Sequence, residues 1–196
     1  MIDRRTMIGA SLAAMSIPLA TAGAHAEAVS SRITAYAFSF PGLSEGEIHL
    51  AEYSGRPLLV VNTASQCGYT GQFAGLQELW TRYRQRGLMV IGVPSNDFGN
   101  QEPGSPSDIM RVAGDRYGVT FPLASKVSVS GENAHPFYKW ASFERPGSPR
   151  WNFHKFLIGR DGRIVGSFPS AVDPLDESLI AAVEKELPAS NSAAKS

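Results

Sequence analysis

The chain has 196 residues, and its 18 basic residues balance its 18 acidic residues to a formal net charge of zero. It has no basic stripe interleaved with aromatic residues, so the composition argues against nucleic acid as a partner. The length suits one domain with a full hydrophobic core and is too short for two comfortable ones.

The first residues resemble an export signal rather than a folded element. The pair Arg4-Arg5 precedes a weakly apolar run, and Ala24-His25-Ala26 supplies an A-x-A cleavage site. The arginine pair is similar to a twin-arginine signal, and Pro18 interrupts a run already too polar for a retained membrane anchor. We therefore expect 1–26 to be a cleavable signal peptide and 27–196 to be one domain. The mature protein is expected in a bacterial periplasm, without stable insertion into the membrane.

The rest of the chain alternates between short apolar strands and amphipathic helices. In chain order, strands are expected at 33–40, 47–50, 58–63, 88–93, 153–158 and 163–168, and helices at 71–86, 105–117, 134–145 and 174–187. The strand–helix–strand unit 58–93 predicts two parallel strands in one sheet, whereas Gly159-Arg160-Asp161-Gly162 predicts a hairpin. A mixed central sheet flanked by helices is an α/β architecture of the thioredoxin-like kind.

The only cysteine, Cys67, lies between the expected strand 58–63 and the expected helix 71–86. This turn places it at the carboxyl end of a strand, where open α/β sheets carry their chemistry. Unpaired N–H groups and the positive end of the helix dipole favour the thiolate, which is the reactive form of cysteine. Composition alone favours a buried, inert thiol, but the position in the turn favours a nucleophile.

Three segments resemble motifs of the glutathione peroxidase family, in the family's order and at compatible distances. They are Asn62–Thr70 (NTASQCGYT), Pro94–Gly104 (PSNDFGNQEPG) and Trp151–Leu157 (WNFHKFL). The similarity extends over nearly the whole chain that follows the predicted signal. It implies a thioredoxin-like fold, in agreement with the predicted elements.

The catalytic tetrad that this resemblance implies falls on Cys67, Gln101, Trp151 and Asn152. The Cys67 thiolate would attack one peroxide oxygen, release water or an alcohol, and become a sulfenic acid. The indole N–H and the two amide NH₂ groups are uncharged donors that can stabilise the sulfur and orient the peroxide. The implied substrates are hydrogen peroxide and organic or lipid hydroperoxides, and the chemistry needs no prosthetic group or metal.

The chain departs from the family pattern in three places. Asp97 replaces a Gln and Ser95 replaces a common Cys, but neither position belongs to the tetrad. Gly114 stands where thioredoxin-dependent relatives keep a resolving cysteine, so an external thiol must re-reduce Cys67 through a mixed disulfide. Glutathione or a thioredoxin-like protein is the expected co-substrate. The short connection between the second and third tryptophans lacks the insertion of tetrameric members, which predicts a monomer.

Two other classes of function fit parts of the pattern. A cysteine hydrolase would pair Cys67 with His49, His135 or His154, although no acyl-transfer motif accompanies them. A non-catalytic exported thiol sensor or binding module would keep the same fold with an unactivated cysteine. Metal binding is not expected, because one cysteine and scattered histidines offer no ligand spacing.

Overall fold

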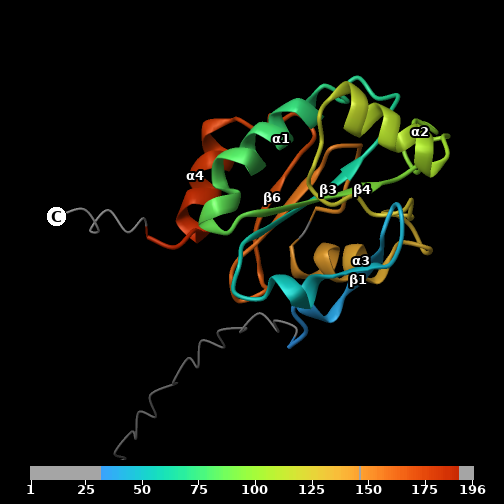
Figure 1. Cartoon of the computed structure of the whole chain (residues 1–196). Helices are drawn as coiled ribbons and strands as arrows, with labels where there is room; N and C mark the ends of the chain where they lie inside the picture. The colour runs from blue at the N-terminus through green and yellow to red at the C-terminus, as the bar shows by residue number, and fades with distance from the viewer. Residues whose placement is uncertain (1–31, 146, 190–196) are drawn as a thin grey trace, which may run out of the picture.

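A computed structural model describes residues 32–145 and 147–189 of the chain. At its centre is a four-stranded sheet with the strand order β4-β3-β5-β6 (Figure 1). The strands are β3 (Leu58–Thr63), β4 (Met89–Pro94), β5 (Lys155–Ile158) and β6 (Ile164–Phe168). β3 and β4 pair in parallel, whereas β5 pairs antiparallel with both β3 and β6. The mixed sheet confirms the predicted α/β fold class.

Four helices flank this sheet: α1 (Gln72–Tyr83), α2 (Pro106–Met110), α3 (Pro136–Glu144) and α4 (Glu177–Glu186). In Figure 1, α1 and α4 cover one face and α3 covers the other. A short 3₁₀ turn, η3 (Arg84–Arg86), extends α1, and a π-helix, η4 (Arg111–Arg116), extends α2. The four helices lie within the ranges that periodicity predicted.

The two faces of β3 belong to two separate hydrophobic cores. Leu59 and Val61 pack in the core that contains α1 and α4, whereas Leu58 and Val60 pack in the core that contains α3. Successive strand residues point to opposite faces, so a continuous apolar run is buried on both sides. Cys67 belongs to the first core. The loop that carries it therefore starts from one of the best-buried strands of the molecule.

The prediction of one strand over 33–40 is wrong. This segment begins with a 3₁₀ turn, η1 (Ala35–Ala37), and only β1 (Ser39–Pro41) is extended. The Ala35 N–H donates to the Gly162 carbonyl at 2.9 Å, so the β5–β6 turn draws the backbone away from an extended path. β1 pairs with β2 (Glu47–His49) in a separate two-stranded sheet. A second 3₁₀ turn, η2 (Leu50–Tyr53), follows it.

The predicted strand over 153–158 starts later than expected. Phe153 has a φ of 64°, a left-handed conformation that a strand cannot contain, so β5 begins at Lys155. Ser105 caps α2, because its side chain accepts from the Asp108 N–H and Pro106 occupies the first turn. The predicted signal peptide, 1–26, lies outside the described residues.

Candidate active site

The β3–α1 loop holds Cys67 in a tight turn that is fastened by one threonine. The Thr70 hydroxyl oxygen accepts from the Cys67 N–H at 3.0 Å and lies 2.7 Å from the Cys67 carbonyl. The Tyr69 N–H points at the Cys67 sulfur, with nitrogen and Sγ 3.4 Å apart. The expected backbone donor to sulfur is therefore present, but it comes from the turn, because α1 begins only at Gln72.

Asn62, near the end of β3, organises the opposite wall of the site. Its Nδ2 donates to the Trp151 carbonyl at 3.0 Å, and its Oδ1 accepts from the His154 N–H at 3.0 Å. Its own carbonyl accepts from the Phe153 N–H at 2.6 Å. These bonds hold residues 151–154, among which Phe153 is left-handed, against β3. The sequence pattern indicated no role for Asn62, although this residue lies in the first family motif.

The structure brings Gln101, Trp151 and Asn152 together beside this strand end. Asn152 is fully buried, and its Nδ2 donates to Gln101 Oε1 at 3.0 Å. Gly99 lies beside both groups: a Cβ on it would be 3.4 Å from the Trp151 ring and 3.5 Å from Gln101 Nε2, in ordinary van der Waals contact. Because its oxygen accepts from Asn152, Gln101 keeps its NH₂ group available as a donor.

A backbone hydrogen bond connects this trio to the cysteine loop. The Gln66 N–H donates to the Gln101 carbonyl at 3.0 Å, one residue before Cys67. Trp151 is 39% exposed, and its ring centroid lies 5.9 Å from that of Phe98. The four residues predicted from the family motifs thus occupy three loops at one end of the sheet, with the indole open to solvent.

Lys155, for which no role was predicted, is fully buried near the site. Its Nζ donates to Gln72 Oε1 at 2.6 Å, to the Phe153 carbonyl at 2.8 Å and to the Val172 carbonyl at 2.6 Å. Burial lowers the pKa of this amine to about 8, and the Asp173 carboxylate opposes that change. The place of Lys155 in an apolar strand, within the third family motif, was the signal of this role in the sequence.

Glu102, next to Gln101, is the second buried ionisable group near the site. Burial raises the pKa of its carboxyl, while neighbouring Ser65 and Lys126 act in the opposite direction. Within the described residues, neither carboxyl oxygen has a well-formed hydrogen bond. Together with Ser65 and Gln66, Glu102 lines a pocket of about 380 Å³ beside the cysteine loop.

The family departures Asp97 and Ser95 have structural roles. Asp97 Oδ2 accepts from the N–H groups of Val129 and Ser130 at 2.6 and 2.9 Å. The buried Ser95 hydroxyl accepts from the Asp97 N–H at 3.3 Å. The two residues fasten the loop at 128–130 to the end of β4 and do not belong to the trio described above.

The histidines do not support a Cys–His hydrolase. His49 lies 3.7 Å from the Glu47 carboxylate, His135 caps α3 and stacks on Phe40, and His154 Nε2 lies 2.9 Å from the Ser167 hydroxyl. In the described part of the chain, none of them is hydrogen-bonded to Cys67. Burial is the main cause that lowers the pKa of His154, to about 4, and the nearby Lys155 adds to it.

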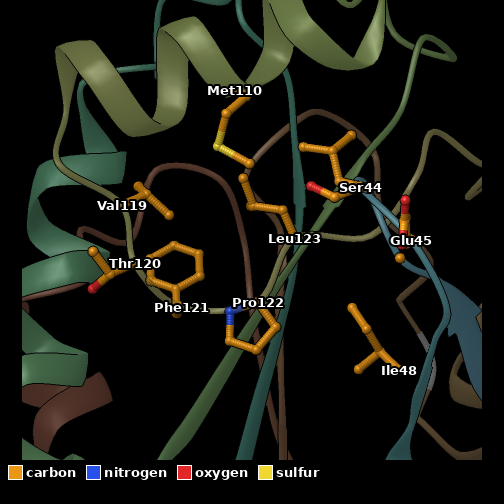
Figure 2. Close-up of a pocket in the computed structure, with 11 residues that line it drawn as sticks. Ser44, Glu45, Ile48, Met110, Val119, Thr120, Phe121, Pro122 and Leu123 are labelled. Carbon is orange, nitrogen blue, oxygen red and sulfur yellow. The ribbon is translucent and has the colours of Figure 1, made fainter.

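A separate pocket of about 310 Å³ lies under α2, between the 42–48 loop and the 119–123 loop (Figure 2). Met110, Val119, Phe121 and Leu123 surround it, and no member of the predicted tetrad lines it. Across residues 32–145 and 147–189, no group of three or more His, Cys, Asp or Glu side chains could hold a metal ion. No helix in those ranges is long and apolar enough to cross a membrane.

Comparison with known proteins decides the family. The glutathione peroxidase family model matches residues 35–142, which is more than half of the chain. A hydroperoxy fatty acid reductase of Synechocystis is 43% identical over 164 residues, covering 79% of this chain and 96% of that protein. The chain belongs to the glutathione peroxidase family.

Other relatives and solved structures agree with this assignment. A glutathione peroxidase homologue of Bacillus subtilis, BsaA, is 41% identical over 146 residues, covering 71% of this chain and 91% of that protein. The crystal structure of apo Trgpx superposes with a TM-score of 0.64 at 35% identity, covering 81% of this chain and 100% of that chain. A thiol:disulfide interchange protein of Chlorobium tepidum superposes with a TM-score of 0.58 at 15% identity, covering 76% of this chain and 92% of that chain. At this low identity the likeness shows the fold alone. The protein is therefore a thiol-dependent peroxidase with a thioredoxin-like fold.

Proposed function

We propose that this peroxidase reduces hydrogen peroxide and organic or lipid hydroperoxides at Cys67, with Gln101, Trp151 and Asn152 as donors around the sulfur. The observation that carries the proposal is the Asn152–Gln101 hydrogen bond beside the end of β3, joined to the cysteine loop through the Gln66–Gln101 backbone bond. These two hydrogen bonds hold uncharged N–H donors at one end of the sheet, without adding a formal cation that would trap the thiolate.

In the first half-reaction, the Cys67 thiolate attacks one oxygen of the hydroperoxide. The S–O bond forms as the O–O bond breaks, the sulfur is oxidised by two electrons, and the leaving oxygen takes up one proton to become water or an alcohol. The product on the protein is a sulfenic acid. Preorganised indole and amide donors stabilise the negative charge as it moves from sulfur to oxygen.

In the second half-reaction, external thiols restore Cys67, because the sequence contains one cysteine. A first thiolate attacks the sulfenic sulfur, water leaves after the hydroxide takes up a proton, and a mixed disulfide remains. A second thiol releases the Cys67 thiolate and departs as a disulfide. Glutathione and a thioredoxin-like protein are the two reductant classes that this scheme accepts.

The proposal includes the location and the assembly of the enzyme. The pair Arg4-Arg5 and the Ala24-His25-Ala26 site support export to the periplasm, followed by action as a monomer of 27–196. Amino-terminal sequencing of the protein recovered from native cells is expected to start at Glu27. An intact Met1 in the mature protein would contradict this part of the proposal.

Stopped-flow oxidation of the reduced protein by hydrogen peroxide and by cumene hydroperoxide tests the chemistry. We expect fast second-order loss of the thiol and a sulfenic acid that dimedone traps, with no reaction in Cys67→Ser. Trp151→Phe keeps an aromatic ring but loses the indole donor, and we expect oxidation to slow by about a hundredfold. If wild-type Cys67 reacts no faster than free cysteine, the protein is a thiol sensor or binding module on the same fold.

A further inference from the structure

A pocket of about 520 Å³, lined in part by the residues on either side of Trp151–Phe153 in the chain, has no role in the two half-reactions. It is lined by Arg145, Gly147, Ser148, Arg150, His154, Ser167, Pro169 and Ser170. Arg150 immediately precedes Trp151, and His154 follows Asn152 by two positions in the chain. The pocket and the proposed catalytic residues therefore share one segment, which Asn62 holds in place.

The lining of this pocket is positively charged at neutral pH. Arg145 and Arg150 are its two permanently charged residues, and no carboxylate lines it. Arg145 Nη2 donates to the Val165 carbonyl at 3.2 Å, which holds the guanidinium at the pocket without neutralising it. Within the described residues, Arg150 has neither a hydrogen bond nor an ion pair to occupy its guanidinium.

The floor of the pocket is polar and fixed. His154 is 7% exposed, and its Nε2 lies 2.9 Å from the Ser167 hydroxyl, so this hydroxyl has a defined place on the wall. With a pKa lowered to about 4, the imidazole is uncharged at neutral pH and contributes a polar group rather than a third cation. Ser148 also lines the pocket, but its hydroxyl donates to Ser142 Oγ at 2.8 Å.

From this arrangement we propose that the pocket binds a carboxylate group of a substrate of the peroxidase, with Arg145 and Arg150 as its ligands. Guanidinium groups present paired N–H donors that match the two oxygens of a carboxylate. Ser167 and Ser170 add hydroxyl groups to the same lining. The inference rests on the proposed function, because it assigns the ligand to the reaction at Cys67. Two substrate types carry such a group: a fatty acid hydroperoxide and a small peptide thiol.

The experiment compares each carboxylate compound with its own ester in the separate half-reactions. In the first arm, reduced protein is oxidised by linoleic acid hydroperoxide or by the methyl ester of this hydroperoxide. In the second arm, protein in the sulfenic form is reduced by glutathione or by glutathione diethyl ester. Both arms use wild type, Arg145→Gln and Arg150→Gln, and each rate is divided by the same variant's rate with hydrogen peroxide.

Arg160→Gln is the matched control, because it removes one exposed arginine in the β5–β6 turn, at the other end of the sheet from the pocket. In one of the two arms, we expect the acid to react faster than the ester with wild type. We expect this advantage to fall about tenfold in Arg150→Gln, the loss typical when hydrogen bonds to a charged group are removed. Arg145→Gln should show the same direction of change and Arg160→Gln should match wild type.

The arm in which the arginine variants lose this advantage identifies the source of the carboxylate. The proposal is overturned if acid and ester react alike in both arms with wild type, or if the two pocket variants behave like Arg160→Gln. It is also overturned if only a protein dithiol reduces the sulfenic form and fatty acid hydroperoxides show no acid preference. Failure of wild type to react with hydrogen peroxide itself would instead refute the proposed function.

Discussion

At the scale of single residues, the site depends on neutral amides that fix one another. The Asn62 side chain donates to the backbone of 151–154 with its NH₂ group and accepts from it with its oxygen. The Asn152 NH₂ group donates to Gln101 Oε1. Each amide is buried or half-buried, where an unpaired donor or acceptor costs about 1 to 3 kcal/mol. The amides therefore set the geometry of the site as well as offering donors to it.

Asn152→Asp tests this interdependence, because it exchanges the donor that faces Gln101 Oε1 for a carboxylate oxygen. We expect the free energy of unfolding to fall by about 1 to 3 kcal/mol, since two acceptors would then face each other in a buried place. Peroxide oxidation of Cys67 should slow as well. Urea unfolding and stopped-flow oxidation measure the two effects. Asn133→Asp, at an exposed position, is the control, and equal stability of the two variants would contradict this reading.

At the scale of elements, Lys155 joins three parts of the chain that the sheet alone does not connect. Its ammonium group contacts the start of α1, the left-handed residue before β5, and the loop that leads to α4. Three neutral acceptors compensate for part of the cost of burying the charge. These hydrogen bonds fix the position of α1 relative to the Trp151–Asn152 segment on the other side of the site.

Lys155→Met removes this contact while nearly keeping the length of the side chain. We expect a loss of about 2 to 4 kcal/mol in the free energy of unfolding, because three buried acceptors lose their donor. The oxidation rate of Cys67 should fall too, since the two walls of the site are no longer fastened together. Lys139→Met, on the exposed face of α3, provides the comparison in urea unfolding and stopped flow. If Lys155→Met is as stable and as fast as Lys139→Met, the contact has no such role.

The elements that the sequence predicted well are those whose pattern is local. The runs 58–61 of β3 and 89–93 of β4 are continuous and apolar because both faces of these strands are buried. The apolar stripe of α1 follows from its single buried face. The segment 33–40 was predicted wrongly because a contact with the distant Gly162 bends it. Within the site, the family motifs indicated Gln101, Trp151 and Asn152, whereas the roles of Asn62 and Lys155 depend on long-range hydrogen bonds that no spacing reveals.

At the scale of the whole molecule, the first residue of β5 and the residue before it are adjacent ionisable groups whose charged forms the fold disfavours. His154 has its pKa lowered to about 4 and Lys155 has its pKa lowered to about 8, in both cases mainly by burial. A protein whose unfolded chain binds more protons than its folded form becomes more stable as the pH rises. Both residues therefore make the folded protein more stable as the pH rises, each in its own range of pH.

The unfolding free energy should accordingly rise with pH in two windows. Between about pH 4 and 6.5, the unfolded chain protonates His154 whereas the folded protein does not, so stability increases toward pH 6.5. Between about pH 8 and 10.5, the unfolded chain keeps the Lys155 proton whereas the folded protein loses it, so this residue again adds stability as the pH rises. Each group contributes a slope of at most one proton, which is about 1.4 kcal/mol per pH unit.

Urea unfolding at a series of pH values, in wild type and in His154→Gln, separates the histidine from the other titrating groups. Glutamine keeps a polar side chain near Ser167 but does not titrate, so the variant should lose the His154 part of the slope between pH 4 and 6.5. Carboxyl groups that titrate in this range contribute equally to both proteins and cancel in the comparison. Parallel profiles over this window would mean that His154 takes up its proton equally in the folded and unfolded states. The imidazole would then be charged in weak acid, and the pocket beside Trp151 would gain a third cation as the pH falls.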